Sequence, residues 1–400
     1  MSDKTDKNFI NETVAKNKKS LKEWMKDGAI FCVEALAFGI IAAMAFSIME
    51  PRVKNLFGKL SAQIVTVSND EDDETTDGSA EQIKQNSEVV KLNEVLNSVV
   101  LIECRTSNLD TNGQKIGEEF DYSSGAVLST GDSTLLLTDY ETVKNSDFIK
   151  VTFEDNTQCE GRVLSVDRQL GIAIVSVDTK GAFKPGYSPN KNVLGKSEGL
   201  KNGDELLYVG MSEGVGKINL MCEIITTDNM VQYTDCIYSM FTTDMASNVA
   251  RNGFVFNEEK QLIGMIARPE NNGIANLVAA LGVTDIKPVI DKLTKGTSLP
   301  YMGINGTTVT DQLKENVNPE MPYGVYVTSV ETNSPAYRVG ILNGDIITKV
   351  AGRNIKSVKE FSNTINSLDA GNSVEVTVNR HGKNGYKKLT FNVIIGGKEN

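Results

Sequence analysis

Short apolar runs separated by turn residues dominate the chain between residues 97 and 292. SVVLIEC, STLLLTD, GIAIVSVD and GFVFN are examples, and many of their residues are β-branched or aromatic. Runs of this length and spacing are typical of a β-barrel or β-sandwich. One stretch, VTDIKPVIDKLTKG, has helical spacing and is followed by Pro300, so we expect a helix and then a domain boundary near Lys295.

The C-terminal hundred residues show a mixed pattern. Strand-like runs such as GVYVTSV and VEVTVNRHG flank a stretch, residues 357–368, in which Val358, Phe361 and Ile365 fall at helical spacing. His381, the only histidine of the chain, lies between two strand patterns and is expected in a hairpin loop. The pattern predicts a small α+β module.

The most apolar segment of the chain is AIFCVEALAFGIIAAMAFSIM, residues 29–49, which is interrupted only by Glu34. Its length is close to the ~20 residues that a helix needs to cross a bilayer core. A cleaved signal peptide is the alternative, because Ala43-Met44-Ala45 fits the small-x-small cleavage pattern, but the long polar segment before it favours an anchor. Seven lysines precede the span and three basic residues follow it closely, which predicts a cytoplasmic N-terminus and an extracytoplasmic main body.

The segment after the predicted span is strongly acidic. SNDEDDETTDGSAEQ contains seven Asp or Glu residues and no large apolar residue, so we expect a self-repelling linker. The predicted organisation is a cytoplasmic segment (1–28), a transmembrane helix (29–49), an acidic extracytoplasmic linker (50–90), a mainly-β domain (91–295) and the α+β module (298–397).

Charge and cysteine spacing restrict the chemistry. The net charge of -11 leaves no basic face large enough to collect phosphates, so no nucleic-acid partner is expected. The five cysteines form no CxxC pair, and neither a metal site nor another cofactor is predicted. Isolated cysteines within strand-like sequence favour buried thiols over disulfides, although the sequence leaves their pairing open.

The order of segments resembles a known family. SSGAVLS, LLLTDYETV, GRVLSVDRQLGIAIVSVD and TTDMASNVARNGFVFN follow one another as in the HtrA (DegP and DegS) family of trypsin-fold serine proteases. Further along, SPAYRVGILNGDII fits the SPAxxAGLxxGDxI signature of the PDZ domain of that family. The resemblance implies a mainly-β chain with a chymotrypsin-like double β-barrel followed by an α+β PDZ domain, behind one N-terminal transmembrane helix.

The same resemblance implies that the catalytic residues are replaced. The TNNHVV segment of the family matches TDYETV, which puts Glu141 at the histidine position, and DLAVL matches GIAIV, which puts Gly171 at the aspartate position. The nucleophile position falls on Asn252, or on Arg251 if the alignment gap is shifted. Acyl transfer needs an oxygen nucleophile, an imidazole and a carboxylate that orients it. We therefore predict a degenerate triad and no catalytic residue.

The PDZ resemblance also implies a peptide site. Tyr301-Met302-Gly303-Ile304 corresponds to the loop that binds a C-terminal carboxylate through backbone N–H groups. Phe361 and Ile365 are the helix residues that we expect to reach the groove. The predicted partners are protein C-termini or unfolded polypeptides.

These observations predict a membrane-anchored HtrA-like pseudoprotease that binds peptides in envelope protein quality control or signalling, located at the cell membrane. Two alternatives stay open at this point. One is an active HtrA-like endopeptidase with a non-standard site. The other is a structural scaffold for a membrane partner, for which a homotrimer is considered.

Overall fold

The computed structural model describes residues 92–111, 114–212, 216–247, 252–266 and 276–398. The predicted span 29–49 and the linker 50–90 lie outside the described residues. Within the described ranges, no helix has both the length and the apolar character that crossing a bilayer requires.

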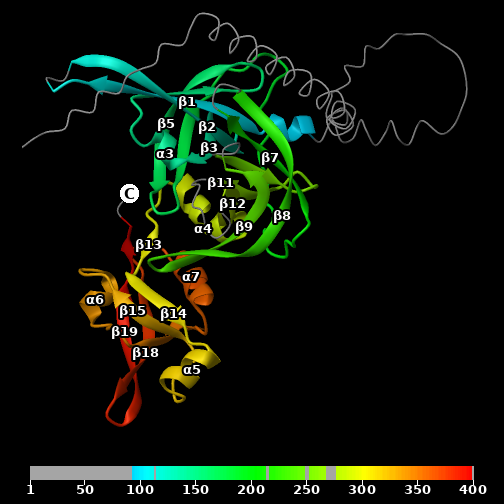
Figure 1. Ribbon diagram of the computed structural model, residues 1–400. Coiled ribbons are helices and arrows are strands. Elements are labelled where there is room, and N and C mark those ends of the chain that lie inside the picture. Colours follow the sequence, from blue (N-terminus) through cyan, green and yellow to red (C-terminus); the bar gives the residue numbers. More distant parts are fainter. Residues whose placement is uncertain (1–91, 112–113, 213–215, 248–251, 267–275, 399–400) are drawn as a thin grey trace, which may run out of the picture. The chain divides into compact units, whose positions relative to one another are not determined.

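Two closed six-stranded barrels form the mainly-β domain (Figure 1). The first barrel has the order β1-β2-β3-β6-β5-β4 and the second has the order β10-β11-β12-β9-β8-β7. The first comprises β1 (Val99–Leu109), β2 (Lys115–Ser129), β3 (Ser133–Asp139), β4 (Phe148–Thr152), β5 (Gln158–Asp167) and β6 (Ile172–Asp178). The second comprises β7 (Glu205–Ser212), β8 (Gly216–Tyr233), β9 (Cys236–Ala246), β10 (Gly253–Phe256), β11 (Leu262–Ile266) and β12 (Leu277–Gly282). The predicted double β-barrel is confirmed.

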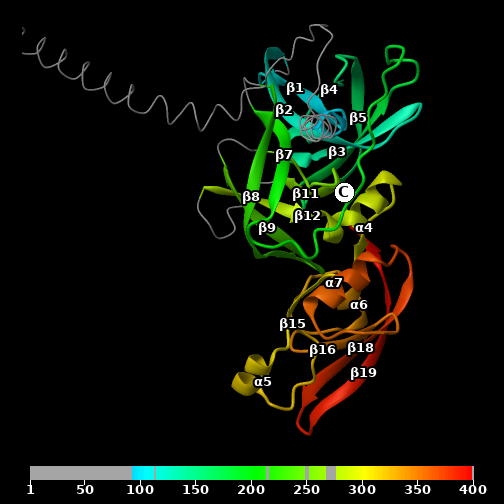
Figure 2. The same cartoon turned by 90° about the vertical axis from the view of Figure 1, so that its right-hand side faces the viewer.

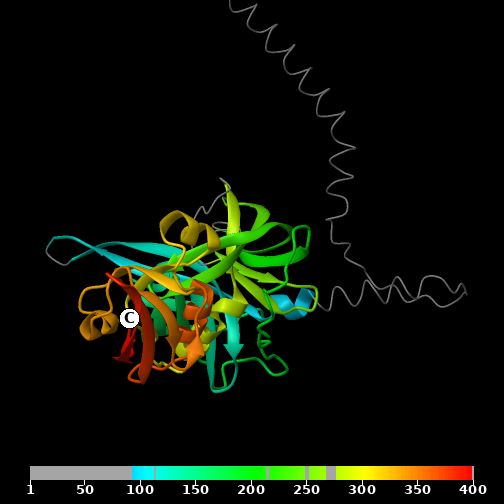
Figure 3. The same ribbon diagram turned by 90° about the horizontal axis from the view of Figure 1, so that it is seen from below.

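Helices α3 (Tyr140–Val143) and α4 (Val283–Thr294) accompany the barrels. α3 is a single turn after β3, too short for periodicity to reveal, and α4 is the helix that the sequence predicted. α4 buries Val283, Ile286 and Leu293 in a core that both barrels share. The β1–β2 hairpin, cyan in Figures 1 and 3, extends beyond its barrel.

The C-terminal module is built on the sheet β14-β15-β16-β18-β19, with β17 paired to β16 and a separate β13–β20 pair (Figure 2). Its strands are β13 (Pro300–Tyr301), β14 (Ile304–Thr308), β15 (Val325–Val330), β16 (Ile346–Val350), β17 (Arg353–Asn354), β18 (Ser373–Gly382), β19 (Gly385–Ile394) and β20 (Gly396–Gly397). Its helices are α5 (Asp311–Val317), α6 (Pro335–Val339) and α7 (Val358–Asn366).

The sequence predicted a hairpin loop for His381, and this prediction is wrong. His381 belongs to β18, where it pairs with Tyr386 of β19, and the turn follows at the next residues. The strand continues further because the β18–β19 ladder remains regular up to the pair of Gly382 and Gly385.

Candidate functional site

Asn252, one of the two residues predicted for the nucleophile position, lies directly before β10. The other, Arg251, lies outside the described residues. Asn252 is 9% exposed. Its side-chain carbonyl accepts a hydrogen bond from the N–H of Ser124 at 3.2 Å, and its amide donates to the carbonyl of Tyr122 at 3.2 Å. Both partners belong to β2. Asn252 therefore joins the second barrel to the first, and both ends of its amide take part in that contact.

A tyrosine holds the backbone at the same position. The hydroxyl of Tyr208, on β7, donates to the carbonyl of Asn252 at 2.7 Å, and the ring is fully buried. Burial raises the pKa of this phenol well above its usual value. A Cβ on Gly210 would come within 1.8 Å of the Tyr208 hydroxyl oxygen, so glycine there makes room for the ring. Tyr208 could not be singled out from the sequence, because its run, DELLYVG, predicts only a strand.

The histidine and aspartate positions lie next to each other in the first barrel. The N–H of Tyr140 donates to the carbonyl of Gly171 at 2.9 Å, which brings α3 against the start of β6. Glu141, on α3, is half-exposed and forms an ion pair with Lys144 one turn later. Gly171 has φ 70°, a left-handed conformation that favours glycine.

A chain of hydrogen bonds connects the end of β3 to Asn252. The hydroxyl of Thr138 donates to the carbonyl of Ser124 at 2.9 Å, and the N–H of Ser124 in turn bonds the Asn252 side chain. Thr138 is also 3.2 Å from the hydroxyl of Ser123. These hydroxyls contact carbonyls and one another, and within the described part of the chain neither an imidazole nor a lysine takes part in this network. That Glu141, Gly171 and Asn252 carry no catalysis stays a prediction.

Asp139 is the buried acid nearest to the histidine position. One carboxylate oxygen caps α3, accepting bonds from the N–H (2.9 Å) and the hydroxyl (3.0 Å) of Thr142. The other oxygen is buried without a hydrogen-bond partner among the described residues. Burial therefore raises the pKa of Asp139 to about 6 despite the two bonds from Thr142.

The predicted carboxylate loop has the geometry of an anion site. The backbone N–H groups of Met302, Gly303 and Ile304 point to one place, because Gly303 adopts φ 88°. A Cβ at this glycine would lie 2.2 Å from the Cβ of Ser334. Tyr301 donates its hydroxyl to Glu331 at 2.7 Å, which fixes the first residue of the loop.

The three N–H groups bind a carboxylate of the chain itself. Asp235, in the turn between β8 and β9, accepts from Met302 at 2.7 Å, from Gly303 at 2.8 Å and from Ile304 at 2.8 Å. Asp235 is 1% exposed. Burial raises its pKa above the usual value, and the three N–H groups oppose that rise. Asp235 could not be singled out from the sequence, because a Thr-Asp pair between two strands is an ordinary hairpin signal.

The helix residues expected in the groove lie in the core of the C-terminal module. Phe361 is 1% exposed and Ile365 is fully buried, and both belong to the cluster that contains Met302 and Ile304. Ile237 of β9 packs against this cluster. A role for Phe361 and Ile365 in peptide binding stays a prediction.

Both domains of the chain match known protein families. Residues 123–265 match the trypsin-like peptidase domain, and residues 300–395 match the PDZ domain. The serine protease Do-like HtrA of Lactobacillus helveticus is 24% identical over 298 residues, covering 68% of this chain and 70% of the relative. In both domains the chain is similar to members of the HtrA family. The predicted resemblance to this family and the predicted PDZ domain are thereby confirmed.

Other relatives agree in architecture. The probable periplasmic serine endoprotease DegP-like of Halomonas elongata is 24% identical over 275 residues, and the chain spans 56% of its length. The serine protease HtrA-like of Staphylococcus aureus strain MRSA252 is 25% identical, with 43% of its length spanned. Among solved structures, the HtrA-type protease AlgW with a decapeptide superposes with a TM-score of 0.59 at 20% identity, over 78% of this chain and 98% of that one. This superposition establishes the shared fold.

Proposed function

We propose that this HtrA-family chain is a membrane-anchored pseudoprotease that binds peptides through its PDZ domain and lacks serine-protease chemistry. The observation that carries the proposal is the place of Asn252. A carboxamide stands at the nucleophile position, and its two polar ends hold the barrels together. A carboxamide is not an acyl acceptor in this chemistry.

No histidine is available to act as the general base of a triad. The chain contains one histidine, and that residue lies in the β18–β19 hairpin of the PDZ domain, its ring 5.1 Å from that of Tyr386. One hydroxyl, that of Thr142, does bond a buried carboxylate, that of Asp139. The same Asp139 oxygen also accepts the N–H of Thr142, so this contact is the N-cap of α3. Without a triad, a protease scaffold keeps at most about 10³- to 10⁴-fold acceleration over water.

The binding role rests on the PDZ loop. Three N–H groups converge on one carboxylate, which is the arrangement that captures the C-terminus of a peptide adding as a strand. AlgW, the structural relative, is known with a bound decapeptide and with a tripeptide. We propose protein C-termini or unfolded chains as partners, and envelope quality control or signalling as the setting. The anchor in this proposal is the segment 29–49, with the main body outside the membrane.

Labelling with a serine-directed fluorophosphonate, followed by peptide release from casein, tests the proposal. We expect neither labelling nor release from the full-length protein, with the Lactobacillus helveticus relative as the positive control. Labelling of a serine in the native protein, abolished by heating, would show an active endopeptidase and overturn the pseudoprotease assignment. Binding of the full-length protein to peptides with free C-termini, and not to amidated copies, tests the PDZ part separately.

A further inference from the structure

The turn between β8 and β9 enters the PDZ domain at the place where a peptide would end. The carboxylate of Asp235 receives all three N–H groups of the loop 302–304, at 2.7 to 2.8 Å. A peptide that binds this loop offers the same chemical group, a carboxylate, to the same donors. The loop cannot hold both carboxylates, because each N–H donates to one acceptor in this geometry.

The hairpin also occupies the strand edge. The N–H of Asp235 donates to the carbonyl of Ile304 at 2.8 Å, and the side chain of Gln232 donates to the carbonyl of Gly306 at 2.7 Å. Both acceptors lie on β14, the end strand of the PDZ sheet. A peptide added as a strand would need these carbonyls for its own N–H groups. The loop 302–304 therefore binds the side chain of Asp235, and the same hairpin covers the free edge of β14.

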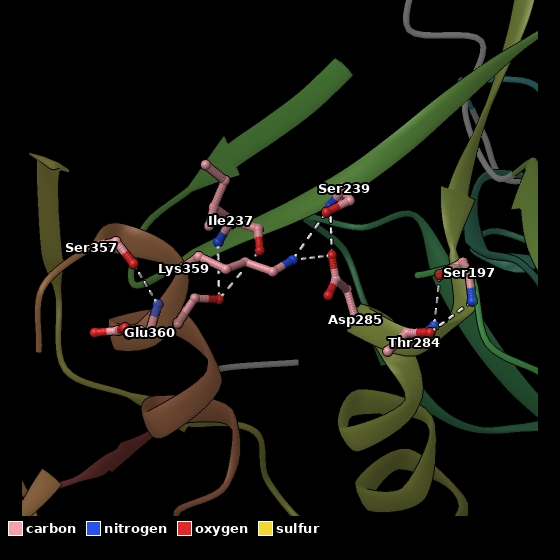
Figure 4. A network of polar contacts seen from close by, with 9 residues as sticks. Ser197, Ile237, Ser239, Thr284, Asp285, Ser357, Lys359 and Glu360 are labelled. Carbon is pink, nitrogen blue, oxygen red and sulfur yellow. Dashed lines mark hydrogen bonds and ion pairs between the residues drawn. The ribbon is translucent and has the colours of Figure 1, made fainter. Parts of the chain in front are cut away.

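The other side of the hairpin lies against the helix. The N–H of Ile237 donates to the hydroxyl of Ser362, on α7, at 3.1 Å, and that hydroxyl is 3.3 Å from the carbonyl of Ile237 (Figure 4). The thiol of Cys236 lies 3.4 Å from the side-chain oxygen of Asn366, also on α7, and is 1% exposed. The hairpin is thus in contact with both walls of the site, β14 and α7.

A polar network fixes α7 to the barrel beside this hairpin. Figure 4 shows the ammonium of Lys359, on α7, between Ser239 of β9 and Asp285 of α4. Asp285 also accepts the N–H of Ser239 at 2.7 Å. A second ion pair joins Lys292 of α4 to Asp369 at 2.6 Å. Release of the hairpin would therefore take place at a junction that is held by ion pairs as well as by the buried carboxylate.

We infer that Asp235 is an internal ligand of the PDZ domain, so that a C-terminal peptide binds only when the β8–β9 hairpin leaves the loop 302–304. This inference rests on the proposed peptide binding for its second half only. The first half, that the loop 302–304 binds the Asp235 carboxylate of the hairpin, concerns only contacts within the chain. Peptide binding and separation of the hairpin from the loop 302–304 are then one event.

Two substitutions remove the internal carboxylate without forbidding the turn. Asp235 has φ 66°, a conformation that Asn and Gly tolerate, so Asp235→Asn and Asp235→Gly both suit the backbone. In Asp235→Asn the charge is lost and an NH2 group replaces one of the two accepting oxygens, so at least one N–H group of the loop loses its acceptor. The matched control is Asp228→Asn, which removes the same charge from an exposed position on β8.

Thiol alkylation measures release of the hairpin without any peptide. Cys236 is the first residue of β9, and its thiol is buried where the hairpin meets Asn366 of α7. In the full-length protein both Asp235 variants should therefore be alkylated at Cys236 at least about tenfold faster than the wild type, whereas Asp228→Asn should match it. Cys104 and Cys222, which are buried inside the barrels, serve as internal references by mass spectrometry. Equal Cys236 rates in wild type and both Asp235 variants would overturn the inference. Faster alkylation of all three cysteines would do the same, because it would indicate general unfolding.

Peptide competition tests the second half. The probe is an array of decapeptides with free apolar C-termini, each beside its amidated copy, incubated with the full-length proteins. Asp235→Asn should bind the free-carboxylate peptides at least about tenfold more tightly than wild type and Asp228→Asn do, since no internal ligand has to be displaced. Equal affinity of wild type and Asp235→Asn would refute the competition. If no protein binds any peptide, the proposed binding function fails, while the alkylation rates still decide whether Asp235 holds the hairpin.

Discussion

Replacing Asn252 by serine tests whether this residue is an altered catalytic residue or a structural link between the two barrels. If the chain were an enzyme with one altered residue, a serine at the nucleophile position would be expected to increase its reactivity. The structure predicts a loss of stability instead. The Asn252 amide bonds Ser124 and Tyr122 across the barrels, and a serine side chain is too short to make both bonds.

The size of the loss follows from the groups left behind. Asn252→Ser leaves the N–H of the buried Ser124 and the carbonyl of the half-buried Tyr122 without their partner. An unsatisfied buried polar group costs about 1–3 kcal/mol, and water will satisfy part of this site, so we expect the free energy of unfolding to fall by about 2–4 kcal/mol. Asn252→Ala should lose a similar amount.

Urea unfolding followed by circular dichroism measures the change, and fluorophosphonate labelling of the same preparations measures reactivity. Asn219→Ser is the matched control, since Asn219 is exposed on β8, and it should change stability by less than about 0.5 kcal/mol. Unchanged stability of Asn252→Ser would refute the bridging role of the amide. Labelling of the introduced serine would show that a working general base is present and would refute the degenerate site.

Three further predictions concern single buried groups. Tyr208→Phe should lower the free energy of unfolding by about 1–2 kcal/mol, because the carbonyl of Asn252 loses its donor; thermal unfolding measures this, and a stability equal to wild type would contradict the contact. Since the pKa of Asp139 is raised from 3.8 to about 6, the folded state binds the proton more tightly than the unfolded state, and this group's contribution to stability declines as the pH rises from 4 to 8 by about 3 kcal/mol. Asp139→Asn should remove that decline. The free energy of unfolding of the variant, relative to that of the wild type, should therefore increase with rising pH. A difference that does not change with pH would refute the raised pKa. Arg380→Ala should destabilise the PDZ domain by about 3–5 kcal/mol, because it leaves the 1% exposed Asp345 without its two-pronged partner, as hydrogen exchange of the PDZ strands would show; exchange rates equal to wild type would contradict it.

Local pattern was sufficient for most of the fold. β3 was predictable because its run STLLLTD places large apolar side chains at buried positions, and α4 because its buried residues recur at helical spacing. β8 was missed, since its 18 residues alternate between buried and exposed positions, include polar turn-formers and are interrupted by irregular pairing with β9. The three triad positions were identified by the family resemblance alone, because nothing local distinguishes Glu141, Gly171 or Asn252 from ordinary loop and turn residues.

The contacts of Asp235 could not have been found in this way, for a physical reason. Its partners are backbone N–H groups some 67 to 69 residues further along the chain, and every residue except proline carries such a group. A site made of backbone donors leaves only one mark in the sequence, the glycine that turns them to a common point, and Gly303 provides it here. The sequence therefore indicates where a carboxylate binds but not which carboxylate. Because a free C-terminus and an aspartate side chain present the same group, the fold decides between them by bringing the β8–β9 turn to the loop, and any external peptide has to compete with a ligand that the chain already carries.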